Sequence, residues 1–134
     1  MPTDYKNLID GELVDNGQWL DVVNPANEQV IGRVPSCGAD ELDRAVAAAR
    51  KAFKTWRKTS VEERRDVLGK ISAAIKDNAE ELFRLLTSEQ GKPHAQAKGE
   101  VYGAAGMVKA LSTLSLEETT NEDSETRLSR TRRV

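Results

Sequence analysis

Short apolar runs separated by turn residues occupy the first 35 residues. The stretch "NLIDGELV" places Asp10-Gly11 between two apolar pairs, and this predicts a β-hairpin because glycine accepts the positive φ of a tight turn. The stretch "WLDVV" predicts a strand that ends at Asn24-Pro25, and "EQVIGRVP" predicts another. We expect these strands to pair in antiparallel fashion.

The spacing of apolar residues changes to a helical period after Gly38. Apolar residues recur every three or four positions up to residue 56, which predicts one amphipathic helix. Ser60 and Glu63 have the spacing of a capping box and predict the start of a second helix. The expected buried stripes are Leu42, Val46, Ala49, Phe53 and Trp56 in the first helix, and Val67, Leu68, Ile71 and Ile75 in the second.

A third, shorter helix is predicted between Asn78 and Gly91. Asn78 can cap its first turn, Gly91 can end it in the left-handed conformation, and Pro93 prevents its continuation. Lys92 places a positive charge near the negative end of the helix dipole. The residues expected to face inward are Ala79, Leu82, Phe83 and Leu86.

A fourth helix is predicted over about 95–115, and neither of its faces is strongly polar. Glycine inside a helix costs about 1 kcal/mol relative to alanine, so three of them make sense where another backbone packs closely. We therefore expect this helix to need partners on two sides, which leaves the core of the chain unfinished. One face holds Val101, Ala104, Val108 and Leu111, and the other holds Gly99, Gly103, Gly106 and Ala110.

The chain divides into three segments on these patterns. Residues 1–36 are strands and turns, residues 39–115 are helices, and residues 116–134 are a polar tail or an edge strand, "TRLSRTRRV". The length of 134 residues suits one domain, or part of one. The predicted class is α/β, with a strand-rich start, about four helices and a C-terminal strand or tail.

Composition removes several classes of function. The formal net charge is only −2, and no aromatic residue is interleaved with the terminal arginines, so nucleic-acid binding is a minority interpretation. No apolar run approaches the roughly 20 residues of a membrane span, and the start resembles no signal peptide. We therefore expect a soluble, cytoplasmic protein that binds neither nucleic acid nor a membrane.

Candidate chemistry is sparse. Cys37 lies in a loop before a predicted helix, but a nucleophile requires a base, and His94 is far along the chain. We interpret Cys37 as an ordinary loop cysteine and His94 as a solvent-facing residue at a helix start. One cysteine and one histidine form no zinc cluster, and no phosphate-binding glycine motif is present.

The order of several landmarks resembles the start of the NAD(P)-dependent aldehyde dehydrogenase family. These landmarks are "LIDGELV", "VVNPANEQVIGRVP", "DRAVAAARKAFKTW", "ERRDVLGKI" and "EQGKPHAQAKGEV", and they cover the chain from about Tyr5. The resemblance implies the N-terminal part of that fold. It also implies, for the complete family, a cysteine thiolate that attacks the aldehyde, hydride transfer to NAD or NADP, and a glutamate-activated water.

The motifs that carry this chemistry in the family have no match in the chain. We therefore assign no catalytic and no cofactor-binding residue, and expect the short chain to be an inactive, truncated or fragmentary relative. The resemblance further implies a partial monovalent-cation site at Val22, Val23 and Glu89. An alternative hypothesis is a truncated paralogue that binds a full-length aldehyde dehydrogenase subunit and regulates it.

Overall fold

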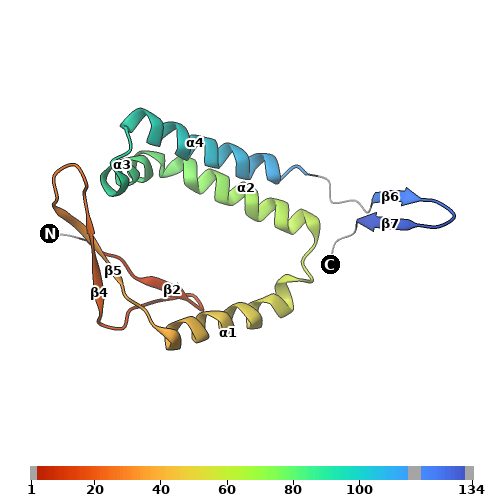
Figure 1. Ribbon diagram of the computed structural model, residues 1–134, viewed down its shortest axis with the longest axis horizontal. Helices are drawn as coiled ribbons and strands as arrows, with labels where there is room; N and C mark the ends of the chain where they lie inside the picture. Colours follow the sequence, from red (N-terminus) through yellow and green to blue (C-terminus); the bar gives the residue numbers. More distant parts are fainter. Residues whose placement is uncertain (1–2, 115–118, 132–134) are drawn as a thin grey trace.

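The computed structural model describes residues 3–114 and 119–131, and Figure 1 shows their arrangement. Strands come first, four helices follow, and a pair of strands ends the described chain, which confirms the predicted α/β class. The strands are β1 (Thr3–Asp4), β2 (Asn7–Ile9), β3 (Glu12–Val14), β4 (Trp19–Val23), β5 (Val30–Pro35), β6 (Thr119–Asp123) and β7 (Leu128–Thr131). The helices are α1 (Ala39–Trp56), α2 (Val61–Asp77), α3 (Ala79–Gln90) and α4 (His94–Leu111).

The predicted hairpin forms between β2 and β3. Asp10 and Gly11 have φ angles of 52° and 87°, the two positive values of a tight hairpin turn. Strands β4 and β5 also pair in antiparallel fashion, as predicted. β1 was not predicted, and it pairs with β5 in parallel. The antiparallel prediction concerned the predicted strands and is confirmed for them, whereas β1 is a two-residue strand too short to leave a pattern.

Asp4 and Arg33 fasten β1 to β5. The Arg33 Nε and Nη2 donate to the two carboxylate oxygens of Asp4 at 2.8 and 2.7 Å, and the Tyr5 amide donates to the Arg33 carbonyl at 2.9 Å. Gly32 permits this close approach, since a Cβ on it would lie 3.0 Å from Tyr5 Cε2. The following segment is held by an ion pair of 3.0 Å between Lys6 and Asp15.

Acid is expected to release this N-terminal segment. Hydrogen bonds from Arg33 and Lys6 lower the pKa of Asp4 and of Asp15 from the ordinary value of 3.8. A lowered pKa stabilises the folded form above the ordinary value, and that contribution is lost as the pH falls through the folded pKa. The NMR signal of the Tyr5 amide should therefore lose its hydrogen-bonded shift only below pH 3.8, as the pH falls through the lowered pKa of Asp4. A signal in Asp4→Asn that keeps this pH dependence would contradict the assignment.

Capping residues account for the start of α2 and the end of α3. Ser60 Oγ accepts from the Glu63 amide at 3.1 Å, and Glu63 Oε2 accepts from the Ser60 amide at 2.7 Å, so the predicted capping box is confirmed. The prediction for Asn78 is wrong, because its side-chain amide donates backward to the Ala74 carbonyl at 2.8 Å. Gly91 ends α3 with a φ of 68°, as predicted.

The core lies among α2, α3 and α4. Its buried residues are Ala79, Phe83, Ala97 and Val101, with Ile75 and Leu86 packed against them. Ser72 is also buried, and its hydroxyl donates to the Ala105 carbonyl at 2.8 Å, which joins α2 to α4.

The buried line of α4 is rotated from the predicted one. It follows Ala97, Val101, Ala105 and Ser112, whereas Ala104 and Leu111 are exposed, because α3 and α2 pack against the former line. The predicted partner for the glycine face is missing within the described chain, since a Cβ at Gly99, Gly103 or Gly106 would meet nothing within 4 Å. This helix therefore has one packed face and one bare face.

The predicted buried stripe of α1 is wrong for this chain. No residue of α1 is buried, and Figure 1 shows this helix lying apart from α2 and α4. Val67 and Ile71 of α2 and Leu82 of α3 are exposed as well. The helical spacing of these side chains was predicted correctly. The described residues, however, supply too little surface to cover them.

The total accessible surface measures how much surface is left uncovered. The accessible surface is 10369 Å² for a chain of 14.8 kDa. A globular protein of that mass exposes about 7,000 Å², so the chain exposes about 3,400 Å² more than a compact monomer would. The expectation of an unfinished core agrees with this excess.

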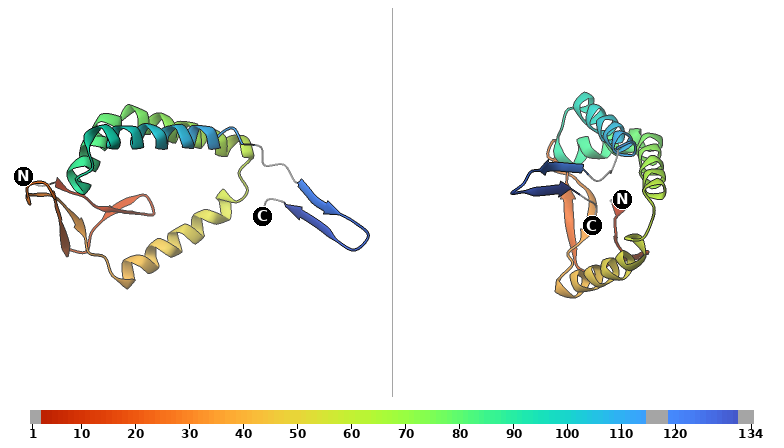
Figure 2. Two further views of the ribbon diagram at one scale, coloured as in Figure 1. Left: turned by 45° about the horizontal axis from the view of Figure 1, so that its top comes forward. Right: turned by 90° about the vertical axis from the view of Figure 1, so that its right-hand side faces the viewer.

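Strands β6 and β7 form a hairpin that projects beyond the end of α4 (Figure 2). β7 lies within the predicted edge strand, but β6 occupies part of the predicted polar linker. The linker prediction missed it because only Thr119 and Thr120 there favour a strand. The predictions for residues 115–118 and 132–134 concern positions outside the described residues.

Candidate functional site

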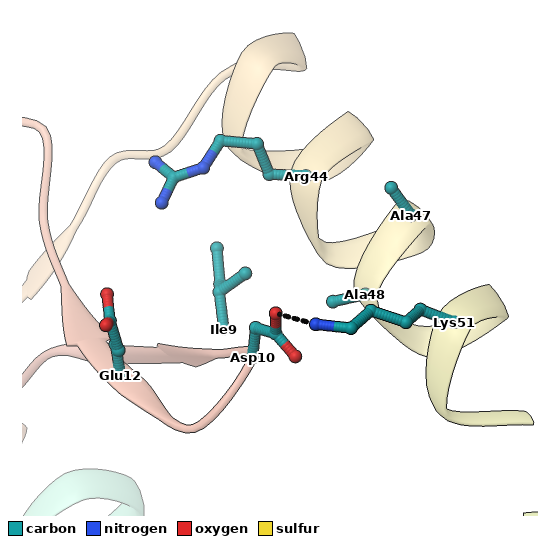
Figure 3. A pocket seen from close by; sticks show the side chains of 7 residues that line it. All are labelled: Ile9, Asp10, Glu12, Arg44, Ala47, Ala48 and Lys51. Atoms are coloured by element: carbon teal, nitrogen blue, oxygen red, sulfur yellow. Dashed lines mark hydrogen bonds and ion pairs between the residues drawn. The ribbon is translucent and has the colours of Figure 1, made fainter. Parts of the chain in front are cut away.

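A pocket of about 390 Å³ lies between the β2–β3 hairpin and α1 (Figure 3). Lys51 Nζ of α1 and Asp10 Oδ2 of the hairpin turn form an ion pair of 3.1 Å across one side of it. Arg44 and Glu12 also line the pocket and carry opposite charges. The lining residues are Ile9, Asp10, Glu12, Arg44, Ala47, Ala48 and Lys51. The pocket lining includes no cysteine, serine, threonine or histidine, and its one lysine is paired with Asp10.

Cys37 lies at a second pocket along the same contact between hairpin and helix. Its thiol is half-buried, and the side-chain amide of Asn7 donates to Sγ at 3.0 Å. Leu8, Ile9 and Leu42 make much of the lining apolar. The one carboxylate of this lining, Glu41, accepts a hydrogen bond from the Gly38 amide at 2.8 Å and so caps α1. The interpretation of Cys37 as a loop cysteine stays a prediction.

His94 lies at the first position of α4 and packs on the helical core. Its exposed ring meets the ring of Phe83 edge-on, with centroids 4.8 Å apart and an interplanar angle of 86°. The prediction of a solvent-facing histidine is correct for exposure, but it missed this aromatic contact. Cys37 and His94 thus have different neighbours, and no catalytic pair forms from these contacts.

The strand end at Val22 and Val23 has an irregular backbone. Val22 pairs with Gly32, Val23 pairs with Val30, and the register shifts between them. Such a bulge interrupts the ladder and leaves backbone groups without strand partners. This is the type of segment that can offer carbonyl oxygens to a hard cation, because such cations prefer oxygen ligands.

The turn after β4 reaches the end of α3, where Glu89 lies. A Cβ on Gly91 would be 3.0 Å from Pro25 Cγ, so the turn and the helix end are in close contact. Glu89 is exposed, two residues before this contact. The structure thus brings together the two segments on which the cation prediction rests, and the binding of a cation stays a prediction.

Metal-binding side chains do not cluster in the described segments. Within residues 3–114 and 119–131, no group of three or more histidine, cysteine or acidic residues could hold a metal ion. The same part of the chain contains no helix that is long and apolar enough to cross a membrane.

Arg64 is a positioning residue that the sequence patterns did not reveal. Its guanidinium donates to the Trp56 carbonyl at 2.8 Å and to Thr59 Oγ1 at 2.9 Å, and it lies 5.4 Å from the centre of the Trp56 ring. These contacts fix the corner between α1 and α2. In the sequence, an arginine that fixes a corner between two helices cannot be told from one exposed to solvent. No sequence signal could therefore have identified the role of Arg64.

Comparison with known proteins decides the family. The model of the "Aldehyde dehydrogenase family" matches residues 13–134. The chain belongs to the aldehyde dehydrogenase family. It is 40% identical over 124 residues to methylmalonate-semialdehyde/malonate-semialdehyde dehydrogenase [acylating] of Rattus norvegicus, covering 89% of this chain and 23% of that protein. It is 43% identical over 104 residues to succinate-semialdehyde dehydrogenase [NADP(+)] GabD of Escherichia coli, covering 76% and 22%.

Solved structures share the arrangement of these elements. An NADP-dependent enzyme of E. coli superposes with a TM-score of 0.84 at 36% identity, covering 92% of this chain and 26% of its own. An NAD-dependent aldehyde dehydrogenase of Sinorhizobium meliloti superposes with a TM-score of 0.82 at 34% identity, covering 96% and 27%. The chain thus spans about a quarter of the length of the relatives it matches.

Proposed function

We propose that this chain serves as the N-terminal structural segment of an NAD(P)-dependent aldehyde dehydrogenase, an enzyme that oxidises an aldehyde to a carboxylic acid. The observation that carries the proposal is the position of α1. This helix buries none of its residues, yet the solved E. coli enzyme shares the arrangement with a TM-score of 0.84. An amphipathic helix whose apolar stripe is exposed is stable at this position where further protein covers the stripe. About three quarters of the E. coli chain lie outside the match and can supply that cover.

The 134 residues alone are proposed to be inactive. Cys37 Sγ accepts a hydrogen bond from the Asn7 side-chain amide, and the carboxylate of Glu41 in the same lining is bound by the Gly38 amide in the cap of α1. NAD or NADP is proposed to bind through the part of the enzyme that this chain does not match. A cytoplasmic location belongs to the same proposal, and the lone, unpaired Cys37 suits a reducing compartment.

The partial cation site belongs to the proposal too. Backbone oxygens at Val22 and Val23 and the carboxylate of Glu89 suit a monovalent cation in chemistry, with further ligands from the rest of the enzyme. Thermal unfolding of an enzyme that carries this segment should shift with potassium concentration, and Glu89→Gln should remove the shift. An equal shift in both proteins would contradict a role for Glu89.

A second candidate function is the binding and regulation of a full-length aldehyde dehydrogenase subunit. The excess exposed surface favours it, because a chain that lacks a closed core gains stability from any partner that binds its folded form. Recovery of an intact dehydrogenase with the tagged chain at a constant ratio would support this function. Recovery of a monodisperse monomer would contradict it.

Assay of the purified chain tests the absence of activity. We expect no increase in absorbance at 340 nm with NAD or NADP and a set of semialdehydes, whereas GabD with succinate semialdehyde serves as the positive control. The physical reason is that no histidine lines the pocket of Cys37 and that its carboxylate, Glu41, is engaged by the Gly38 amide in the cap of α1. Turnover that disappears in Cys37→Ala would show that the chain is an enzyme by itself and would overturn the proposal.

A further inference from the structure

The turn between β3 and β4 contains Asn16-Gly17, and no other asparagine of the sequence is followed by glycine. In such a pair the backbone nitrogen of the glycine can attack the side-chain carbonyl carbon of the asparagine. The two groups belong to adjacent residues, so their meeting costs little entropy, and glycine has no Cβ to obstruct the approach. Asn16 and Gly17 are both exposed, and a Cβ on Gly17 would meet nothing within 4 Å. The turn therefore combines a reactive pair with open surroundings.

Three hydrogen bonds hold this turn closed. The Gly17 amide donates to Asp15 Oδ1 at 3.2 Å, and the Gln18 amide donates to Asn16 Oδ1 at 3.1 Å. The side-chain amide of Asn16 donates to the Ser36 carbonyl at 2.9 Å. All three bonds are exposed, and water replaces the partners of such bonds at little net cost. The turn is therefore expected to open locally while the rest of the chain stays folded.

We propose that Asn16 is a modification site, at which the side-chain amide is lost when the turn opens. The Gly17 nitrogen forms a bond to Asn16 Cγ, the bond from Cγ to Nδ2 breaks, and Nδ2 leaves as ammonia with the proton that the Gly17 nitrogen gives up. Water then adds to either carbonyl carbon of the cyclic imide, which opens to aspartate or isoaspartate. No electrons are exchanged, and water is the only co-reactant. The reaction does not depend on aldehyde oxidation.

Loss of the amide changes the contacts that hold the end of β5. Ser36 directly follows β5, and the turn holds it twice. Its carbonyl accepts from Asn16 Nδ2, and its amide donates to the Gln18 carbonyl at 2.8 Å. An ionised carboxylate at position 16 has no hydrogen to donate, and its charge repels the carbonyl oxygen. Ser36 leads into Cys37 and α1, so the modification loosens the connection between the strands and the first helix.

Peptide mass spectrometry of the 134-residue chain, incubated folded at mildly alkaline pH, tests the site. We expect position 16 to gain the mass difference between an amide and an acid, with isoaspartate among the products. Asn27 is the internal control, because it is exposed and its Oδ1 accepts from the Gln29 amide at 3.1 Å, but Glu28 follows it. Asn27 should keep its amide. Asn16→Gln should keep its amide too, since its longer side chain closes the ring far more slowly.

Two outcomes of this experiment would overturn the proposal. The first is equal loss of amide at Asn16 and Asn27, which would remove the role of glycine. The second is a folded chain that keeps its Asn16 amide while the urea-unfolded chain loses it, which would show that the folded turn is closed to the reaction.

Substitution of Asp15 tests the opening of the turn. Asp15→Ala removes the acceptor of the Gly17 amide and should speed the loss about fivefold, the factor that one such hydrogen bond sets. Lys6→Met is the matched control, because it breaks the ion pair of 3.0 Å with Asp15 but leaves that acceptor in place. It should change the rate by less than about twofold. Equal rates in Asp15→Ala and the unaltered chain would contradict the gating by this bond.

The product itself tests the structural consequence. In Asn16→Asp the amide of Ser36 should exchange its hydrogen with solvent about fivefold faster than in the unaltered chain, because one of the two contacts that hold Ser36 is lost. Asn16→Gln, which keeps a donor, should show a smaller change. Unchanged exchange in Asn16→Asp would overturn the effect of the modification on the end of β5.

Discussion

Replacing Phe83 by alanine is expected to destabilise the helical unit of α2, α3 and α4 by about 3 kcal/mol or more. Phe83 is the largest side chain of the core cluster, and it contacts the ring of His94 as well as the neighbouring core residues. The core of this chain is small, so the surrounding residues Ala79 and Ala97 can fill little of the cavity that is left. Most of the helical unit should therefore unfold at low denaturant concentration.

Urea unfolding followed by far-ultraviolet circular dichroism measures this effect. Tyr102→Ala is the control, because Tyr102 is an aromatic residue of α4 that is 46% exposed. Its loss should change the free energy of unfolding by roughly 0.5 kcal/mol or less. Equal destabilisation by the two substitutions would show that Phe83 is not at the centre of the core.

Gly91→Ala is expected to cost about 2 kcal/mol and to separate the strands from the helices. The φ of 68° at Gly91 is a left-handed conformation that disfavours a Cβ by about 1–2 kcal/mol. The added Cβ would also lie 3.0 Å from Pro25 Cγ, an atom of a constrained ring. Relief of this contact requires the turn after β4 to move away from the end of α3.

Thermal unfolding and the NMR signals of the turn measure this effect. Gly69→Ala serves as the opposite control, since Gly69 lies within α2 and a Cβ on it would meet nothing within 4 Å. Alanine there should stabilise the helix by about 0.5–1 kcal/mol. An unchanged melting temperature in Gly91→Ala would contradict both the strain and the contact with Pro25.

The elements that the sequence predicted correctly are those that depend on local interactions. The turn at Asp10-Gly11, the capping box at Ser60 and the stop at Gly91 each need only residues close in the chain. The two most clearly wrong predictions are those of burial. They are the buried stripe of α1 and the packed glycine face of α4. The period of α1 is correct, but whether Phe53 is buried depends on protein that the described residues do not include.

The candidate site was predictable only in part. The contact between Pro25 and Gly91 brings together the segments of Val22, Val23 and Glu89, which the family resemblance had singled out. The ion pair of Asp10 with Lys51 and the corner made by Arg64 were not foreseen. Both join residues whose side chains look like ordinary solvated charges in the sequence, and only the packing of two elements reveals their partners.

Segment exchange is the measurement that tests the central claim most directly. The N-terminal part of E. coli GabD that matches this chain, at 43% identity over 104 residues, would be replaced by the matching residues of this chain. We expect the hybrid to fold and to reduce NADP with succinate semialdehyde, while the 134-residue chain alone does not. A hybrid in which the exchanged segment stays unfolded, or that binds no nucleotide, would contradict the assignment of this chain as a structural segment of an aldehyde dehydrogenase.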